Sequence, residues 1–272
     1  MIGVKFNGRL GNQLFQYVFF QYLRSNNKRR LFYFANPHHS YFSKYFDLDY
    51  SYLLDNKFCV FLSKVLTRLI PFREIYIQSI EVPKPVKARN WTLYKGFFQN
   101  DWYLNNTPEK YEIKLKKQFV DEFVKDFGDL FSKNKIIVVH IRRTDYLKYG
   151  KRDISLPMEY FKDRLDHIKD VDSYKVIFVS DDMEHVKLFF PAKDNYIFSS
   201  NSEIIDFQII QNADVAIISN SSFAWWASYL SPKSNLVYAP KNWLAFRIGK
   251  EHPKKIMTDK FIWCDVLNEN KI

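Results

Sequence analysis

The sequence predicts an α/β fold with a parallel sheet, and three observations support this prediction. In the second half, short apolar runs alternate with segments of helical periodicity from residue 136 to residue 239. Near the start, a strand-like run, a glycine-bearing turn and a helical pattern follow one another. Polar residues also stand directly after several apolar runs, where open parallel sheets bind ligands. Such alternation implies parallel strands with helices on both faces of the sheet.

In the first half, the elements are less regular. The strand–turn–helix unit covers residues 2–6, 8–12 and 13–24. Its glycines fit neither the dinucleotide pattern GxGxxG nor a P-loop, although such a turn can still approach a phosphate closely. The other elements that we expect here are helical patterns at 58–69, 99–104 and 111–131, a strand at 91–98 and an irregular connection at 83–85.

The second half has a clearer pattern. Its buried-type apolar runs are mostly β-branched, as in strands that are covered on both faces. The expected strands are 136–141, 175–180, 195–198, 214–219 and 235–239. The expected helices between them are 157–169, 183–190, 203–212 and 222–230.

The chain is long enough for two domains. It has 272 residues, of which 47% are hydrophobic, so it can bury a sizeable core. A polar stretch at 132–135 separates the irregular half from the regular one. We therefore predict two domains, residues 1–132 and residues 133–272.

Basic residues exceed acidic ones in this chain. The 41 Lys and Arg outnumber the 30 Asp and Glu, a formal net charge of +11, and most of the excess lies in residues 1–132. Such a surface attracts nucleic acid, anionic membranes or phosphorylated substrates. Basic segments such as 26–30 and 114–117 are short and do not repeat, which argues against nucleic acid. Contact with a membrane surface stays open.

Cysteine usage and the start of the chain indicate the cytoplasm. Cys59 and Cys264 do not make a disulfide framework, and they lack metal-ligand spacing. The first strand-like run begins at residue 2, which leaves no room for a signal peptide. The most apolar later stretch, 58–72, contains Lys64 and Arg68 and is too short to span a bilayer.

Polar residues follow three predicted strands of the second half. They read HIRRTD at 140–145, SDD at 180–182 and SNSS at 219–222. Because the carboxyl ends of parallel strands meet at one edge of a sheet, we expect these residues to lie close together. Arg142 would bind phosphate oxygens, and the amides of a helix capped by Asn220 or Ser221 would bind the anion from the opposite side. The expected ligand is a nucleotide diphosphate.

Most of these residues also have a structural explanation. Asp181 and Asp182 can cap the following helix, and His140 can be a buried histidine with a satisfied ring. Arg142 has no comparable explanation, because burying an unpaired charge costs several kcal/mol. Arg142 is therefore the strongest candidate for ligand binding.

Four motifs together resemble one family of enzymes. They read GRLGNQLFQY at 8–17, KGFFQNDWY at 95–103, HIRRTDY at 140–146 and NSSFAWW at 220–226. They resemble glycosyltransferase family 11, the bacterial α-1,2-fucosyltransferases. This resemblance implies a GT-B-type fold, in which two Rossmann-like domains face a cleft. The first domain would be the acceptor side, and the second would bind a GDP-sugar donor, with a last helix that packs back on the first domain.

The resemblance also implies roles for individual residues. Those assigned to the donor are Arg9, His140, Arg142, Asp206, Ser221 and Ser222. Arg142 and the helix start at Ser221 would hold the diphosphate, while His140 and Asp206 would contact guanine. Arg9 and Asn12 would reach the phosphate or the fucose from the first domain.

The implied reaction inverts the configuration of the sugar and needs no metal or other cofactor. Pre-placed arginines and helix amides can stabilise the phosphate charge that a metal stabilises in other enzymes, and the sequence has no Asp-x-Asp motif. An inverting displacement calls for a base, for which Asp145 and Asp153 are the candidates. Asp145 can instead pair with Arg142 or Arg143, and we expect Arg143 to brace it.

The expected activity is transfer of L-fucose from GDP-β-L-fucose to the 2-hydroxyl of a terminal galactose. The acceptor would be a free oligosaccharide or a lipid-linked antigen repeat at the inner membrane, and the basic first half favours the latter, with peripheral membrane contact. The alternative is a sugar-nucleotide or glycan-binding protein without turnover. A nucleic-acid-binding protein, a third reading, rests on net charge alone.

Overall fold

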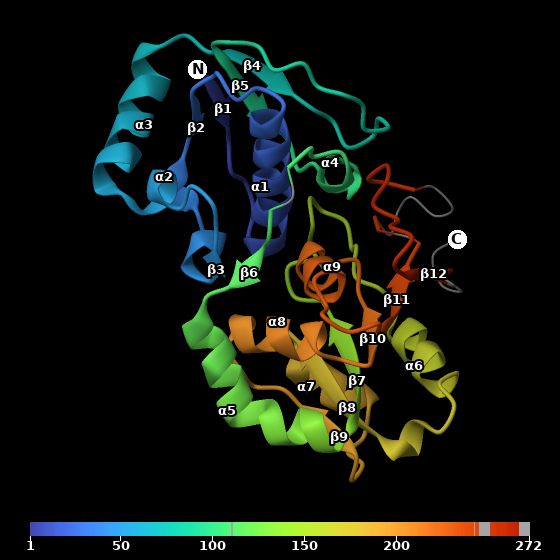
Figure 1. The fold of residues 1–272 in the computed structure, drawn as a ribbon. Coiled ribbons are helices and arrows are strands. Elements are labelled where there is room, and N and C mark those ends of the chain that lie inside the picture. The colour runs from blue at the N-terminus through green and yellow to red at the C-terminus, as the bar shows by residue number, and fades with distance from the viewer. Residues whose placement is uncertain (110, 242, 245–250, 267–272) are drawn as a thin grey trace. The chain divides into compact units, whose positions relative to one another are not determined.

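The computed structural model describes residues 1–109, 111–241, 243–244 and 251–266, which form two compact units (Figure 1). The amino-terminal unit comprises Met1–Lys116 together with Pro253–Ile256. The carboxy-terminal unit comprises the other described residues from Lys117 onward. No helix in these ranges is both long and apolar enough to cross a membrane.

The boundary between the units differs from the prediction. Helix α5 (Lys117–Lys133) belongs to the carboxy-terminal unit, so the chain divides before this helix rather than after residue 132. Helix α5 packs beside α8 (Glu203–Gln211), where the Gln208 side chain donates to the Phe119 carbonyl at 2.9 Å (Figure 1). The polar stretch at 132–135 is therefore a turn into the next strand. The functional assignment of the two parts stays a prediction.

Four parallel strands form the sheet of the amino-terminal unit. They occur in the order β2 (Phe32–Phe34), β1 (Ile2–Val4), β5 (Thr92–Lys95) and β4 (Arg73–Tyr76). Helix α1 (Leu10–Ser25) is buried along nearly its whole length, as expected of a helix that is apolar on most sides. The predicted strand–turn–helix unit and the strand within 91–98 are confirmed.

The remaining elements of this unit are short. Strands β3 and β6 pair in the antiparallel sense. Because β6 occupies the start of the helix expected at 111–131, that helix begins only at Lys117. The elements are η1 (Pro37–His39), η2 (Phe42–Lys44), β3 (Phe46–Asp47), α2 (Tyr52–Asp55), α3 (Lys57–Leu69), α4 (Trp102–Asn105) and β6 (Lys114–Leu115).

Six parallel strands form the sheet of the carboxy-terminal unit. In sheet order they are β12 (Ile262–Cys264), β11 (Leu236–Pro240), β10 (Val215–Ile218), β7 (Lys135–Ile141), β8 (Tyr174–Ser180) and β9 (Tyr196–Phe198). The five strands predicted in this half are confirmed, and β12 is an additional edge strand. The expected last helix is not among the residues described after β12, and residues 267–272 lie outside that description.

Helices cover both faces of this sheet. Figure 1 shows α6 on one side and α5 with α8 on the other. The four helices predicted between the strands are α6 (Met158–Asp166), α7 (Met183–Phe189), α8 and α9 (Ser222–Tyr229), with the 3-10 turn η3 (Val171–Ser173) before β8.

The strand order reverses between β7 and β10. From β7 the chain proceeds through β8 to β9 in one direction, and from β10 through β11 to β12 in the other. This is the order of dinucleotide-binding folds, whose ligands bind at the carboxyl ends of the strands beside the point of reversal. The polar residues after β7 and β10 therefore occupy the position where this fold forms a ligand site.

Candidate functional site

His140 lies at the end of β7 and is buried, with 5% of its surface exposed. Its Nδ1 lies 2.9 Å from the Ser219 hydroxyl, and the Ser219 amide donates to the His140 carbonyl at 3.1 Å. Burial lowers the pKa of His140 to about 4, so its ring is neutral at neutral pH. The histidine is satisfied, as its structural explanation predicted, and it fixes the ends of β7 and β10 together.

Arg142 follows β7 and is held between two carboxylates. Its Nε donates to Asp145 Oδ1 at 2.8 Å, and its Nη1 lies 3.0 Å from Asp181 Oδ2. The side chain is 17% exposed, so its charge is largely buried but compensated. A guanidinium has more N–H donors than these contacts use, which leaves donors for a further anion. The pairing of Asp145 with Arg142, one of the two pairings expected for Asp145, is confirmed, so Arg142 does have a structural explanation, contrary to the sequence-based expectation.

Arg143 also contacts two carboxylates, and it shares one of them, Asp181, with Arg142. Its amide donates to Asp181 Oδ1 at 2.8 Å, and its Nε donates to Asp182 Oδ2 at 3.1 Å. The prediction that Arg143 braces Asp145 is therefore wrong, because the ion pair of Asp145 is with Arg142. Asp182 also accepts from the His185 amide at the start of α7, as its capping role predicted.

Asp181 is a site residue whose part the sequence did not reveal. It contacts Arg142, the Arg143 amide and the Thr144 hydroxyl, so one carboxylate organises the loop that follows β7. The adjacency of β7 and β8, whose ends pair Ile141 with Ser180, makes this contact geometrically simple. The sequence signal for this contact was that two predicted neighbouring strands, β7 and β8, are both followed by charged residues.

Helix α9 begins on the other side of the reversal point. Ser221 is its N-cap, and no capping hydrogen bond from the Ser221 side chain is present, so the amides of the first turn from Ser222 onward remain suited to an anion. Ser221 is buried and Ser222 is partly exposed. The helix therefore begins where the sequence predicted, and its role toward a phosphate stays a prediction.

Asn220 supports this helix start rather than capping it. Its Nδ2 donates to the carbonyls of Ile154 at 2.8 Å and Trp243 at 3.0 Å. Its buried Oδ1 has no hydrogen-bond partner within the described ranges. The Tyr146 hydroxyl donates to the Asn220 carbonyl at 3.1 Å, which joins the loop after β7 to the start of α9.

Asp206 lies on α8 and is mostly buried. It accepts a hydrogen bond from the Ser199 hydroxyl, which follows β9 at the same edge of the sheet. Desolvation raises the pKa of Asp206 to about 6, against the lowering effect of that hydrogen bond. A buried carboxylate that is near its pKa at neutral pH is a frequent feature of ligand sites.

Asp153 is the second predicted base, and it shapes the loop between β7 and α6. Its Oδ1 accepts from the Ser155 amide at 2.8 Å and from the Ser155 hydroxyl at 2.6 Å. The Ile154 amide donates to the Tyr146 carbonyl at 2.9 Å, so the loop folds back on itself. Asp153 is therefore held in place by its own loop.

Arg9 and Asn12 lie in the amino-terminal unit, at the carboxyl end of β1. Gly8 adopts φ +75°, and a Cβ there would lie 2.4 Å from Asn12 Nδ2, so this turn requires glycine. Asn12 Oδ1 accepts from Gln99 Nε2 at 2.7 Å, which links the turn to the segment after β5. Arg9 is exposed and immediately precedes α1.

Gln16 is an organising residue of this turn that the sequence-based site did not include. Its side chain accepts from the Asn7 amide at 2.9 Å and donates to the carbonyls of Asn7 at 3.2 Å and Gly96 at 3.0 Å. It is fully buried. Buried polar groups need hydrogen-bond partners, so a glutamine among large apolar residues next to a glycine turn was the signal for this role.

Across the described ranges, no group of three or more His, Cys, Asp or Glu is arranged to hold a metal ion. Cys59 and Cys264 are both unpaired with any other cysteine. At the carboxyl ends of the strands in the carboxy-terminal sheet, the structure places three features: Arg142 with its two carboxylate partners, the start of α9, and the buried Asp206. This arrangement is suited to an anion next to a polar ring.

Comparison with known proteins points to sugar transfer. Residues 125–259 match the model of glycosyl transferase family 11. An α-1,2-colitosyltransferase of Escherichia coli is 26% identical over 260 residues, covering 87% of this chain and 90% of that protein. The O-antigen biosynthesis glycosyltransferase WbnK of the same species is 34% identical over 116 residues, covering 39% of this chain and 38% of WbnK.

Solved structures show the same architecture. The fucosyltransferase NodZ from Bradyrhizobium aligns with a TM-score of 0.52 at 12% identity, covering 85% of this chain and 92% of NodZ. A glycosyl transferase family 9 protein from Veillonella parvula aligns with a TM-score of 0.52 at 10% identity, covering 97% of this chain and 85% of that chain. At these identities the likeness establishes the fold, which is of the GT-B type.

Proposed function

Because residues 125–259 match the model of glycosyl transferase family 11, we propose that this chain transfers L-fucose from GDP-β-L-fucose to the 2-hydroxyl of a terminal galactose. The observation that carries this proposal is the arrangement of polar groups at the reversal point of the carboxy-terminal sheet. There Arg142 follows β7 and the start of α9 follows the neighbouring β10. A diphosphate placed between them would meet a guanidinium on one side and helix amides on the other.

The guanine of the donor would lie along the same edge. Asp206 can accept hydrogen bonds from a purine edge when it is ionised, and ligand N–H donors would favour that form. The neutral His140 ring lies 6.0 Å from the Phe223 ring, so guanine would meet apolar as well as polar surface there. These contacts support the roles that the resemblance assigned to both residues.

The reaction would be a single displacement that inverts the sugar. The acceptor oxygen attacks the anomeric carbon of fucose while the bond to the β-phosphate breaks, and GDP leaves with the electron pair. Arg142 and the first-turn amides of α9 would stabilise the negative charge that develops on the phosphate. We expect this reaction to need no metal, because those groups already supply the positive charge.

We propose that Asp153 is the base that accepts the proton of the acceptor hydroxyl. Asp145 would instead hold Arg142 in position. Asp145 is ion-paired with Arg142, so its carboxylate orients the guanidinium beside the leaving group. The Ser155 contacts hold the Asp153 carboxylate in the loop after β7, the strand that also leads to Arg142. A base is required because the attacking hydroxyl must lose its proton.

A second donor is favoured by one specific observation. The relative with the longest match reported above is an α-1,2-colitosyltransferase. Colitose is L-fucose without the 3-hydroxyl, so GDP-colitose would fit the same diphosphate and guanine contacts. A pocket that hydrogen-bonds the 3-hydroxyl would reject colitose strongly, whereas an apolar lining would accept both sugars.

We infer that the acceptor is a galactose-terminated glycan and that the amino-terminal unit contributes to its recognition. Both curated relatives are glycosyltransferases, and WbnK is named for O-antigen biosynthesis. Arg9 and Asn12 lie at the carboxyl end of the amino-terminal sheet, the edge at which parallel α/β sheets bind ligands. These residues are our candidates for contacts to the sugar.

Incubation with sugar nucleotides and galactosides tests the proposed function. The protein is mixed with GDP-fucose or GDP-colitose and with lactose or N-acetyllactosamine, with and without EDTA, and products are analysed by NMR. We expect an α-1,2-linked product from GDP-fucose that forms equally in EDTA. Binding of GDP-fucose without product would support the non-catalytic alternative, while use of GDP-colitose alone would move the proposal to the second donor. Loss of activity in EDTA would contradict the metal-free mechanism.

A further inference from the structure

Helix α3 turns its most apolar face toward solvent. We name the stripe formed by Phe58, Phe61, Leu62, Val65 and Leu69 the α3 face; the spacing places all five on one side of the helix. Phe58 is 69% exposed, Phe61 is 63% exposed and Leu69 is 77% exposed. Large apolar side chains normally face the core, so this exposed row calls for an explanation.

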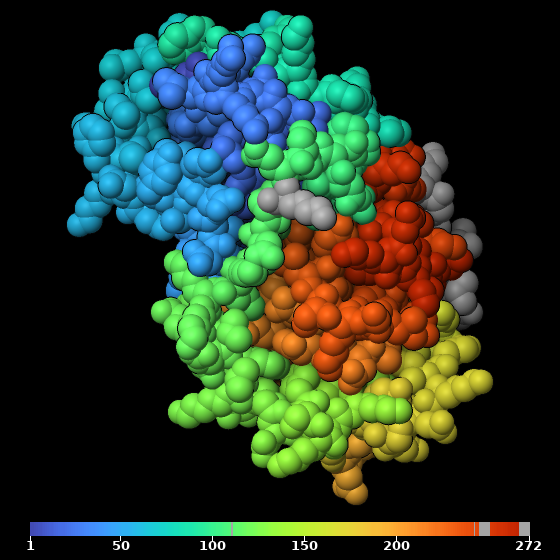
Figure 2. Space-filling model, in the orientation of Figure 1, coloured from blue at the N-terminus to red at the C-terminus, as the bar shows by residue number. Residues whose placement is uncertain are grey.

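The opposite side of α3 attaches the helix to its unit. Ser63 is the buried residue of the helix, at 5% exposure, and the Thr67 hydroxyl donates to the Ser63 carbonyl at 3.0 Å. The Asn56 side chain caps the first turn by accepting from the amides of Phe58 and Cys59. The helix is therefore well formed, Ser63 lies on the side that faces the unit, and the apolar face is left outward. Figures 1 and 2 show it at the outer margin of the amino-terminal unit.

Positive charge flanks the α3 face. Lys57, Lys64 and Arg68 share one side of the helix, next to the apolar stripe. No acidic residue occurs from Lys57 to Arg73. A narrow apolar stripe beside a row of cations is typical of helices that lie in the interface of anionic membranes.

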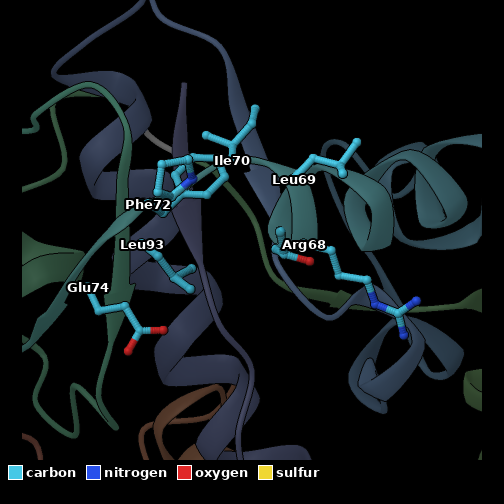
Figure 3. A pocket seen from close by; sticks show the side chains of 8 residues that line it. Arg68, Leu69, Ile70, Phe72, Glu74 and Leu93 are labelled. Atoms are coloured by element: carbon cyan, nitrogen blue, oxygen red, sulfur yellow. The ribbon is translucent and has the colours of Figure 1, made fainter.

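The apolar surface continues beyond the helix. A pocket of about 340 Å³ opens where α3 leads into β4. Its apolar lining is Leu69, Ile70, Pro71, Phe72 and Leu93, and Thr67, Arg68 and Glu74 complete it. Figure 3 shows the rings and aliphatic side chains of the labelled apolar residues near one another, while the Arg68 guanidinium extends away from them. The Phe72 ring lies 6.2 Å from the ring of Trp91, which is 53% exposed. Tryptophan is enriched where apolar and aqueous phases meet.

We propose that the α3 face is a docking surface for a bilayer that contains anionic lipids. An anionic bilayer fits this surface because three cations border the apolar stripe and no acidic residue occurs from Lys57 to Arg73. The stripe from Phe58 to Leu69 is roughly 17 Å long, at about 1.5 Å per residue, and is convex, so it can insert among lipid headgroups without a complementary groove. This inference does not depend on the sugar that the enzyme transfers.

Vesicle flotation with the full chain tests the proposal. The probes are vesicles of phosphatidylcholine alone and vesicles in which about a third of the lipid is phosphatidylglycerol. We expect the protein to float with the anionic vesicles and to remain behind with the neutral ones. Binding should weaken as salt rises, because exposed charges are screened.

Two sets of substitutions separate the apolar and basic parts of the surface. We expect Phe58→Gln with Phe61→Gln to lower vesicle affinity at least about tenfold, since both rings would insert. We expect Lys57→Gln, Lys64→Gln and Arg68→Gln together to lower it on the order of 100-fold at low salt.

Matched controls lie on the carboxy-terminal unit. Leu188 is 83% exposed, so Leu188→Gln removes an exposed apolar side chain elsewhere. A second control changes three exposed lysines to Gln and so removes as many positive charges as the triple α3 variant does. These lysines are Lys125, Lys169 and Lys187. We expect both controls to bind vesicles within about twofold of the wild type.

Transfer to a water-soluble acceptor and thermal unfolding accompany each binding measurement, so that a misfolded variant is recognised. The proposal would be overturned if the wild type did not bind vesicles. It would also be overturned if the α3 variants and their controls lost vesicle affinity to the same extent. Light scattering measures the oligomeric state of the wild type and of each variant. A dimer that the α3 substitutions dissociate, without any vesicle binding, would identify the face as an interface between two copies instead. Because flotation needs no donor, its outcome is separate from that of the transfer assay.

Discussion

The imidazole of His140 and the hydroxyl of Ser219 lie 2.9 Å apart and join β7 to the segment after β10, across the line where the strand order reverses. Both residues are buried. The base of the candidate donor site is thus a neutral hydrogen-bonded pair, and the charged groups stand above it on the loop that follows β7. This arrangement links the stability of the fold to the protonation of one histidine.

Acid should destabilise the protein through His140. Burial lowers its pKa in the folded state to about 4, whereas the unfolded value is about 6.5. Its stabilising contribution is therefore complete above pH 6.5 and is lost as pH falls from about 6.5 to about 4, by about 2 kcal/mol at pH 5. Urea unfolding of the wild type and His140→Asn at pH 7.5 and pH 5 measures this. We expect a flatter pH dependence in the variant, and His167→Asn, at an exposed position, should keep the wild-type slope.

Asp206→Asn should stabilise the protein while weakening donor binding. Burial raises the pKa of Asp206 to about 6, so the folded state favours the protonated form, and that favourable contribution is lost as pH rises from about 4 through 6. At pH 7.5 we expect the variant to be more stable by about 1–3 kcal/mol. GDP affinity should fall roughly tenfold or more, because the amide cannot accept as the carboxylate does. Unchanged GDP affinity would remove Asp206 from the guanine site.

Asp153→Asn and Asp145→Asn should fail in different ways. We expect Asp153→Asn to lower kcat by roughly 10²-fold or more at unchanged GDP affinity, as for loss of a general base. We expect Asp145→Asn to weaken GDP binding, because it releases one side of Arg142. Steady-state kinetics with GDP titrations distinguish these outcomes, and wild-type kcat in Asp153→Asn would contradict the assignment.

Gly8→Ala should disturb the turn that carries Asn12. The added Cβ would lie 2.4 Å from Asn12 Nδ2 at φ +75°, so both backbone strain and a clash arise. We expect transfer to fall more than stability, which should drop by about 1–2 kcal/mol. Gly150→Ala is the matched control, because its φ is +53° with no atom within 4 Å of the new Cβ. An equal unfolding cost in both variants would show that strain alone matters.

The carboxy-terminal sheet was readable from sequence because its strands are long and apolar. Strand β7 is buried from Ile136 to Ile141, and its run of β-branched residues identifies it. Strands β2, β4 and β12 were not predicted; β4 reads REIY and is largely exposed, whereas the similarly short β9 was predicted from its place in the alternation of strands and helices. Local patterns also placed the unit boundary at a polar turn, since the packing of α5 on α8 is a long-range property.

The sequence predicted which residues lie at the strand ends of the site. It did not predict which carboxylate pairs with which arginine. The convergence of Arg142 and Ser221 follows from the rule for parallel sheets. The choice of Asp145 for Arg142 and of Asp182 for Arg143 depends on loop geometry that no spacing reveals. Asp181 shows the same limit, because it reaches across from the neighbouring strand.

Arg142→Lys should remove most of the transfer activity. A lysine keeps the charge but loses the planar fork that meets two phosphate oxygens at once. We expect kcat/KM for the donor to fall by roughly 10²–10³-fold. Arg164→Lys, on α6 and paired with Asp163, provides the matched control and should leave kcat/KM near the wild-type value.

In the proposed function, the diphosphate of a GDP-sugar binds between Arg142 and the start of α9. Calorimetric titration of GDP and GMP into the wild type and Arg142→Lys tests it without requiring an acceptor. We predict that the wild type binds GDP much more tightly than GMP, and that Arg142→Lys loses most of this preference. Wild-type affinity of the variant for GDP would contradict the claim.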